Sequence, residues 1–488
     1  MGNDERSVEV TQLFTLLDKS TGRLVGGDRA PVGELASVVS SLAGQLVEAG
    51  SLPSAPIAYI APPGVDGALA FLAAACVGQA APLNPKLTGE EMRDYIAALK
   101  PALVVATADR RADLEVEGVQ VTEWVQGPGG LSLKGLPGAA GFAPTPAPDE
   151  TALILPTSGT TGAPKQVPLT HRQLVASATN IASWLELTND DVALTMMPLF
   201  HIHGLVAGVL APLLQSGTVA VEPFDAFAFS KVTAQHRPTW MSAVPTMYAL
   251  LIKRWHDRSD ELTIDQLRFA RTSSSALAPA LLDQIETLLG VPAAEAYGMT
   301  EASHQLAANP IAPGARRPGS VGVATGTEIR IENPDDSGRG EVLVRAPQVT
   351  HGYRDASTAN ANAFIDGWFR TGDEGVLDDG WLTLTGRIKE MINRGGEKVA
   401  PLEVEEKLHL LNGVVDCAVF AMPHDLLGEE VAAAVVLDRD VDATTVKEHL
   451  KGHLAAHKIP NRFEFVDELP VGPTGKVQRS RLAEQLGL

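Results

Sequence analysis

The sequence predicts an α/β protein: a large N-terminal domain of two α/β subdomains and a small β-rich unit, followed by a small α+β domain. Two observations support this fold class. Residues 31–122 and 151–310 alternate short apolar runs with stretches of helical periodicity, which is typical of β-α-β units. From about residue 319 the pattern changes to short strands separated by Gly and Asp turns, which indicates an antiparallel unit. Mixed helical and strand patterns begin near residue 388.

The first subdomain is expected to alternate helices with strands. Apolar residues at helical spacing predict helices over residues 35–47 and 65–77, and short apolar runs predict strands over 58–60 and 104–107. Residues 127–149 are rich in Gly, Pro and Ala, and we interpret them as a surface linker.

The rest of the chain is expected to continue with elements of the same kinds. In order, these are strands over 190–197 and 218–221 with a helix over 205–214 between them, short strands over 328–331, 340–345 and 381–384, and a last segment with helices over 402–411 and 443–454 and strands over 416–421 and 431–437.

Composition limits the class of protein. A chain of 488 residues exceeds one ordinary core, so at least two domains are expected. The formal charge of −20 argues against nucleic acid or an anionic membrane surface as the main partner. Neither Cys76 nor Cys417 has a C-x-x-C partner, which excludes the common zinc and redox motifs and favours a cytoplasmic location. The longest apolar run, residues 204–214, is too short to span a membrane.

One segment carries a strong chemical signal, because hydroxyl side chains, glycines and a lysine occur together directly after an apolar run at residues 152–155. It reads Thr157-Ser158-Gly159-Thr160-Thr161-Gly162-Ala163-Pro164-Lys165. Backbone N–H groups and hydroxyls that follow a buried strand, with a cation just beyond, are suited to holding phosphate oxygens. The spacing does not match a Walker A motif, so we predict a phosphate loop of another kind.

Five further segments occur in order along the chain. They are Met197-Pro198-Leu199-Phe200-His201, Tyr297-Gly298-Met299-Thr300-Glu301, Arg370-Thr371-Gly372-Asp373, Gly386-Arg387-Ile388-Lys389-Glu390 and Pro473-Thr474-Gly475-Lys476. With the phosphate loop, this set resembles the adenylate-forming superfamily of acyl-CoA synthetases, luciferases and peptide-synthetase adenylation domains. The resemblance implies a reaction in two steps, in which a carboxylate attacks the α-phosphorus of ATP and a thiol, usually coenzyme A, then displaces AMP.

The resemblance also implies how the first step is carried out. The phosphate loop, from Thr157 to Lys165, would handle the β- and γ-phosphates as pyrophosphate leaves. Glu301 would hold Mg²⁺, and Thr300 would donate to the α-phosphate. Lys476 would bridge the carboxylate and the α-phosphate as charge develops.

The nucleoside and the second step involve other matched residues. Tyr297 would lie against adenine, Asp373 would accept bonds from the ribose hydroxyls, and Arg387 would contact ribose or phosphate. The resemblance implies that the small domain is mobile, which gives domains of residues 1–386 and 387–488 with a hinge at Lys389. After rotation, the pantetheine path of CoA would be lined by Arg394, Gly395, Gly396 and Lys398.

The acid pocket is expected to be polar. His203, Ser274 and His304 would place donors where ligases for fatty or aryl acids usually have apolar side chains. Because a buried donor without a partner is costly, an acceptor-rich acid is expected. The resemblance implies that His201 gates access. The stretches 201–203, 297–304 and 309–310 are most similar to the oxalyl-CoA synthetase subgroup, whose substrate carries a second carboxylate. In the three segments expected to line the pocket, residues 200–204, 271–276 and 301–304, Arg271 is the only arginine, which argues against longer dicarboxylates such as malonate.

Other interpretations stay open. The same chemistry could load a medium-chain or aryl acid, or an amino acid in a stand-alone adenylation enzyme, which would need a carboxylate for the substrate amine. A non-catalytic nucleotide-binding protein would be favoured if Glu301 or Lys476 were missing, and both are present. A luciferase-like oxygenase shares the fold and is not excluded by the motifs, but nothing in the sequence specifically requires oxygen chemistry. We expect a monomer or homodimer whose partners are a small carboxylate and CoA.

Overall fold

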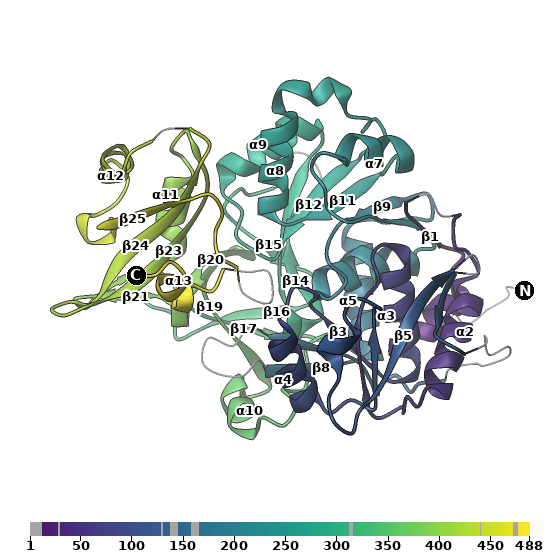
Figure 1. The fold of residues 1–488 in the computed structure, drawn as a ribbon. Coiled ribbons are helices and arrows are strands. Elements are labelled where there is room, and N and C mark those ends of the chain that lie inside the picture. The colour runs from purple at the N-terminus through teal and green to yellow at the C-terminus, as the bar shows by residue number, and fades with distance from the viewer. Residues whose placement is uncertain are drawn as a thin grey trace, which may run out of the picture.

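The computed structural model describes residues 12–27, 30–127, 130–136, 145–157, 165–311, 316–439, 441–471 and 477–488, whose strands form three sheets (Figure 1). The first sheet is mostly parallel. Its strands, in spatial order, are β6 (Gly130–Leu133), β5 (Gln120–Gly127), β4 (Leu103–Ala106), β2 (Pro56–Ile60), β3 (Gln79–Leu83), β7 (Thr151–Thr157) and β8 (Lys165–Thr170).

Helices cover both faces of this sheet because its strands are apolar on both faces. In β2, Ile57 and Tyr59 pack in one core with α2 (Leu35–Glu48) and α3 (Val65–Val77). The alternate residues Ala58 and Ile60 pack in another core with α4 (Gly89–Leu99). A continuous apolar run is what a central parallel strand requires, and the predicted α/β layering of this subdomain is confirmed.

The second sheet begins parallel and continues antiparallel. In spatial order it contains β1 (Arg23–Val25), β10 (Thr218–Val221), β9 (Val192–Thr195), β11 (Trp240–Ala243), β12 (Phe269–Ser273), β13 (Ala293–Met299), β14 (His304–Ala308), β15 (Gly322–Ala324), β20 (Trp381–Arg387), β19 (Trp368–Asp378), β17 (Gly340–Arg345) and β16 (Glu328–Glu332), with β18 (Phe364–Ile365) beside β19. The predicted β-rich unit is therefore not a separate sheet; it extends the second one, and the change of direction falls between β13 and β14.

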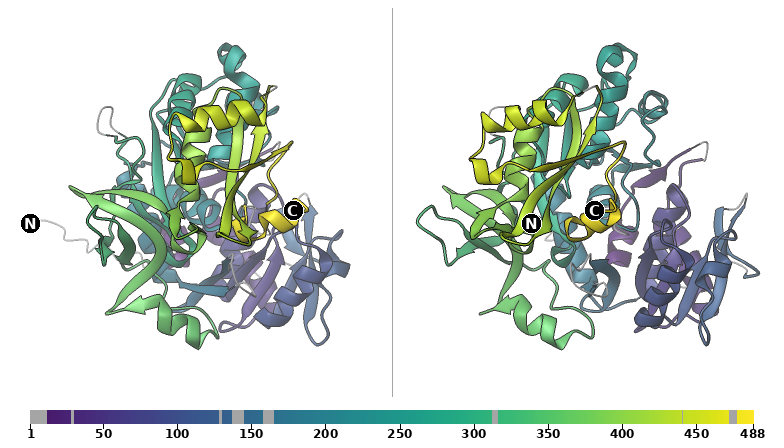
Figure 2. Two further views of the ribbon diagram at one scale, coloured as in Figure 1. Left: turned by 90° about the vertical axis from the view of Figure 1, so that its left-hand side faces the viewer. Right: turned by 60° about the vertical axis from the view of Figure 1, so that its left-hand side comes forward.

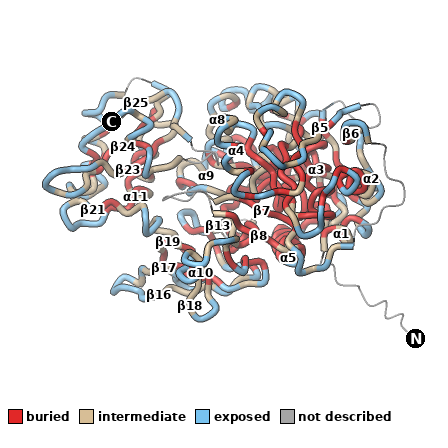
Figure 3. Tube along the Cα trace, turned by 60° about the horizontal axis from the view of Figure 1, so that its bottom comes forward, coloured by how far each residue is buried: buried red, intermediate tan, exposed pale blue. Residues whose placement is uncertain are grey.

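The two large sheets share one central core. Residues of both sheets pack in it with α1 (Leu13–Lys19), α3, α5 (His171–Trp184) and α6 (Ala211–Leu214). The outer face of the second sheet is covered by α7 (Phe229–His236), α8 (Pro245–Trp255) and α9 (Pro279–Leu289). Figure 3 shows the buried residues concentrated in this part of the molecule, around α3. A double-sheet body results, and it carries Tyr297, Thr300 and Glu301 at or near a strand end and Asp373 within β19.

Two local expectations need correction. The segment interpreted as a linker, residues 127–149, contains β6, which pairs with β5 because Trp124 and Leu133 bury apolar side chains across the hairpin. The helix expected over residues 205–214 starts earlier, as a π-helix over His203–Leu210 that continues into α6. Single π-turns within helices are rare and occur often at functional sites.

The C-terminal segment builds the third sheet at one side of the molecule (Figure 2). Its strands, in spatial order, are β22 (Glu397–Val399), β21 (Ile392–Arg394), β24 (Gly428–Leu437) and β23 (Val414–His424), with β25 (Arg462–Val466) beside β24; its helices are α11 (Pro401–Leu408), α12 (Ala443–Lys451) and α13 (Arg479–Gln485). The predicted small α+β unit is confirmed. The domain boundary at residues 386/387 and the hinge at Lys389 stay predictions.

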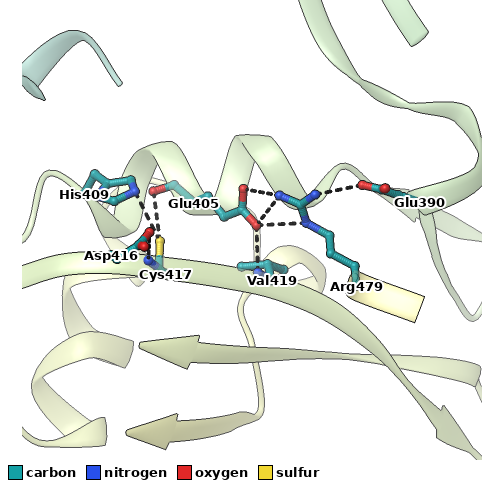
Figure 4. A network of polar contacts seen from close by, with 7 residues as sticks. All are labelled: Glu390, Glu405, His409, Asp416, Cys417, Val419 and Arg479. Atoms are coloured by element: carbon teal, nitrogen blue, oxygen red, sulfur yellow. Dashed lines mark hydrogen bonds and ion pairs between the residues drawn. The ribbon is translucent and has the colours of Figure 1, made fainter. Parts of the chain in front are cut away.

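One arginine ties the last helix to this unit (Figure 4). Arg479, at the start of α13, donates to both carboxylate oxygens of Glu405 in α11 and, at 2.8 Å, to Glu390. Glu405 also accepts from the backbone N–H of Val419 in β23. Bidentate, partly buried pairs of this kind fix geometry more than they add stability, so the start of α13 is held in register with α11 and β23.

No helix in the part of the chain that the structure describes is long and apolar enough to cross a membrane.

Candidate active site

Six of the predicted site residues lie outside the described residues: Ser158, Gly159, Thr160, Thr161, Gly162 and Lys476. The two ends of the phosphate loop are described. Thr157, the last residue of β7, pairs with Lys165, the first residue of β8. The loop therefore begins and ends at one point of the first sheet.

Glu301 and Thr300 lie in the 3₁₀ turn Thr300–Ala302 between β13 and β14. The carboxylate of Glu301 accepts a hydrogen bond from the hydroxyl of Tyr353 at 2.9 Å, and its backbone carbonyl accepts from the N–H of Thr350 at 2.7 Å. The ring of Tyr353 faces the ammonium of Lys165, whose Nζ lies 4.4 Å from the ring centroid. The phosphate-loop lysine and the predicted metal-binding carboxylate thus meet at one tyrosine.

Tyr297, Asp373 and Arg387 form a second group. The buried carboxylate of Asp373 accepts from the Tyr297 hydroxyl at 2.5 Å and from Arg387 Nε at 2.9 Å. Burial, together with the nearby carboxylate, raises the pKa of Tyr297 well above its ordinary value, so its hydroxyl keeps its proton and donates. The structure therefore brings together the three residues predicted to bind the nucleoside, on β13, β19 and β20.

The acid-pocket residues surround a buried arginine in the middle of β12. Arg271 is 1% exposed. Its Nη1 lies 3.1 Å from Ser242 Oγ and 3.3 Å from His203 Nε2, and its Nη2 lies 3.0 Å from His304 Nε2. The same Nη2 donates to Gln305 Oε1 at 2.9 Å. No carboxylate pairs with Arg271 among the residues that the structure describes.

Arg271 contacts both imidazoles. A guanidinium only donates, so Nε2 of His304 accepts from it. His203 Nε2 lies 2.6 Å from Ser242 Oγ as well as 3.3 Å from Arg271 Nη1, and its Nδ1 lies 3.0 Å from Ser274 Oγ. The two rings stack with their centroids 4.7 Å apart. Burial lowers the pKa of Arg271 to about 10, which still leaves it charged at neutral pH.

The backbone around these side chains is strained. Ser274 has φ of 79° and His304 has φ of 105°, values that cost a non-glycine residue roughly 1–3 kcal/mol. Gly298 allows this turn, because a Cβ there would lie 1.6 Å from the carbonyl oxygen of His304. Such strain persists only where the surrounding contacts enforce it, and here it coincides with the predicted pocket.

His201 lies at the approach to the π-helix. Its ring packs against Phe200 with centroids 4.4 Å apart, and its backbone N–H closes a turn on Pro198. The gating role of His201 stays a prediction.

The predicted CoA-facing residues lie on the C-terminal unit. Lys389 is exposed in the turn after β20, and Lys398 is exposed on β22. Gly395 and Gly396 form the β21–β22 turn with φ of 61° and 95°, a conformation that favours glycine. Arg394 forms an ion pair with Glu430 at 2.5 Å, so in this structure its guanidinium is engaged within its own unit.

Four residues at the site were not selected from the sequence: Ser242, Arg271, Gln305 and Tyr353. One signal was available for Arg271, since a charged residue inside the fully buried strand Phe269–Ser273 is unusual for a central parallel strand. Ser242, Gln305 and Tyr353 join the site only through the packing of β11, β14 and the segment after β17, which no local pattern reveals.

Known proteins share this architecture. The AMP-binding enzyme model matches residues 25–354, and the model of the AMP-binding enzyme C-terminal domain matches residues 403–476. An oxalate–CoA ligase of Arabidopsis thaliana is 37% identical over 474 residues, which cover 92% of each chain. A sulfoacetate–CoA ligase of Cupriavidus necator is 36% identical over 474 residues, covering 93% of this chain and 92% of the other.

Solved structures agree with the sequence relatives. The crystal structure of ATP-bound MatB from Rhodopseudomonas palustris matches with a TM-score of 0.87 at 29% identity, over 98% of this chain and 99% of that one. The chain therefore belongs to the AMP-binding enzyme family, a group of acid–thiol ligases, which confirms the adenylate-forming superfamily predicted from its motifs.

Proposed function

We propose that this enzyme is an ATP-dependent acid–CoA ligase for a small carboxylate with a second anionic group, and that oxalate is its acid. The observation that carries the proposal is the buried charge of Arg271 behind the stacked rings of His203 and His304. A buried cation is costly unless negative charge compensates it, and the described partners of Arg271 are neutral. A second carboxylate on the substrate supplies that charge.

Geometry and charge favour a short acid over the alternatives. An aryl or medium-chain acid would leave Arg271 uncompensated and would put apolar surface against two imidazoles and two hydroxyls. An amino acid would bring an ammonium group toward a buried guanidinium, which repels it. Oxalate and sulfoacetate, the acids named for two relatives, each carry a carboxylate and a second anionic group. This similarity supports the class of acid.

From the sequence alone, Arg271 was noted as the only arginine of the pocket segments and was given no role. The expected pocket therefore had no positive group to bind a second carboxylate. In the proposed site Arg271 acts through the imidazoles, because its four Nη contacts go to protein groups and its Nε–H is buried without a partner in the described structure. The imidazoles lie between Arg271 and the substrate, so they occupy the space that a carbon between the two carboxylates would need. Oxalate, which has no such carbon, is therefore preferred over malonate.

The residues present fit a magnesium ion shared with ATP. Mg²⁺ in phosphate sites is held by one or two protein carboxylates together with phosphate oxygens and waters. Glu301 offers one carboxylate whose Oε1 is oriented by Tyr353, and no group of three or more His, Cys, Asp or Glu side chains forms a metal cage within the described ranges. The ion would neutralise phosphate charge.

The proposed mechanism assigns each group a step. Asp373, Arg387 and Tyr297 hold the nucleoside while the acid carboxylate attacks the α-phosphorus and pyrophosphate leaves. Lys165 and the loop before it bind the leaving phosphates, and Lys476 stabilises the charge at the α-phosphate. The CoA thiol then attacks the acyl carbon and AMP leaves. Arg394 would exchange its ion pair with Glu430 if it meets CoA in a second arrangement of the small domain.

The decisive experiment is a panel of acids in an assay of CoA-dependent AMP release from ATP. Oxalate, sulfoacetate, malonate, acetate and benzoate cover the anionic, apolar and aryl classes at matched concentration. The proposal expects the highest kcat/KM for oxalate and a low value for acetate, which has the same reacting group without the second charge. A preference for acetate or benzoate over every dianionic acid would overturn it.

A further inference from the structure

A short segment after β17 connects the two halves of the phosphate site. The hydroxyl of Thr350 donates to the carbonyl of Pro168 in β8 at 2.8 Å, and its N–H donates to the carbonyl of Glu301 at 2.7 Å. Arg354 donates its N–H to the carbonyl of Gln166, the residue after Lys165, at 2.9 Å. Residues 350–354 are thus bonded to the strand that carries the phosphate-loop lysine and to the turn that carries the predicted metal carboxylate.

Tyr353 lies in the middle of this segment and contacts both functional groups. Its hydroxyl donates to Glu301 Oε1 at 2.9 Å, and its ring faces Lys165 Nζ at 4.4 Å from the centroid. An aromatic face attracts a cation, so the ring and the hydroxyl act on opposite charges at once. An ionised carboxylate can only accept, so the Tyr353 hydroxyl is the donor of this bond.

The position of the ring is itself enforced. The amide of Asn360, in α10 (Ser357–Ala363), accepts from the Tyr353 N–H at 2.7 Å and donates to the Tyr353 carbonyl at 2.8 Å. The ring packs against the central core and against the core of the antiparallel strands. A side chain fixed on its backbone and on two cores can impose its geometry on flexible Lys and Glu side chains.

We propose that Tyr353 is a positioning residue that sets the phosphate-facing ammonium of Lys165 and the metal-facing carboxylate of Glu301 relative to each other. This role rests on the proposed function, because it presumes that Mg·ATP binds here. It predicts that the tyrosine hydroxyl and the tyrosine ring make separable contributions. The hydroxyl affects the gain in nucleotide affinity that magnesium provides, and the ring affects affinity for the phosphates themselves.

The test measures binding of α,β-methylene-ATP by calorimetry, with excess Mg²⁺ and with EDTA, so no turnover is needed. Tyr353→Phe keeps the ring and removes the bond to Glu301. We expect the magnesium-dependent gain in affinity to fall about tenfold while affinity in EDTA is unchanged, since a hydrogen bond to a charged group is lost. Tyr353→Leu should lower affinity in EDTA as well, by about threefold, since the cation–π contact is also lost.

Tyr59→Phe is the matched control. Tyr59 is fully buried, and its hydroxyl has no hydrogen-bond partner in the described structure, so removing it should leave both affinities unchanged. If Tyr353→Phe lowers only thermal stability and leaves the magnesium-dependent gain as in wild type, the positioning role is overturned while the proposed function stands. If wild-type protein shows no magnesium-dependent binding of the analogue, both fail.

Discussion

Replacing Arg271 tests whether a buried positive charge selects the acid. In Arg271→Met the side chain keeps a similar volume and loses its charge and its four Nη contacts. The change leaves the buried acceptors Ser242 Oγ, His304 Nε2 and Gln305 Oε1 each without one donor, so thermal unfolding is measured beside the kinetics. The proposed acid pocket then contains two imidazoles and no cation behind them.

The size of the effect follows from distance. Arg271 Nη2 lies 3.0 Å from His304 Nε2. Adding the width of an imidazole ring and one further hydrogen bond places a substrate carboxylate about 8 Å from the charge. At an effective dielectric constant of about 20, the attraction over that distance is about 2 kcal/mol, or roughly 30-fold in kcat/KM. Acetate has no second carboxylate, so its kcat/KM should change far less.

The assay compares kcat/KM for oxalate, acetate and ATP in matched variants. Arg271→Lys keeps a charge without the fork that reaches both imidazoles, and should lose less than Arg271→Met. Arg268→Met is the control for removing a nearby arginine, because Arg268 pairs with Asp191 at 2.8 Å, outside the site. An oxalate kcat/KM that is unchanged in Arg271→Met, or an equal loss for oxalate and acetate, would refute charge selection.

Three further predictions concern other residues. His304→Ala should raise KM for oxalate far more than KM for ATP, and an unchanged oxalate KM would remove the imidazole from the pocket. Lys476→Ala should abolish adenylation while a pre-made acyl-adenylate still passes to CoA; equal loss of both steps would contradict its separate role. Burial raises the pKa of Glu295 from 4.5 to about 8, so the folded protein holds an extra proton between these values. Its stability therefore falls as pH rises through that window, by up to about 1.4 kcal/mol per pH unit. In urea unfolding, the free energy of unfolding of Glu295→Gln minus that of wild type should be larger at pH 8 than at pH 5. An equal difference at both pH values would contradict the pKa shift.

Elements with one dominant pattern were predictable from sequence. The helix expected over residues 65–77 matches α3, Val65–Val77, because every one of its residues is buried, Asp66 included, and a glycine flanks each end. Strand β6 was missed because its few residues lie in a Gly- and Pro-rich stretch, and only pairing with β5 shows that they are a strand. Pairing is a tertiary fact that local periodicity does not contain.

The site residues also fall into two groups, those that sequence motifs identified and those that only tertiary contacts reveal. Motif spacing identified Glu301, Asp373 and Tyr297, and the structure places the last two in direct hydrogen-bond contact. Arg271 stands in a polar segment, residues 271–276, but received no role from the sequence, and Tyr353 belongs to none of the matched motifs. Each acts across the fold, Arg271 on residues of the π-helix and β14, and Tyr353 on β8 and the turn after β13.

The turn between β13 and β14 explains how one site can recognise an acid and activate ATP independently. Glu301 and His304 are only three residues apart, yet different contacts hold them. The backbone of the turn is fixed by the bond from Thr350 N–H to the Glu301 carbonyl and by the bond from the Ser303 hydroxyl to the Gln348 carbonyl at 2.9 Å. The imidazole contributes to neither, so the proposed acid pocket can be altered at His304 while the Glu301 carboxylate, proposed to face the phosphates, keeps its position.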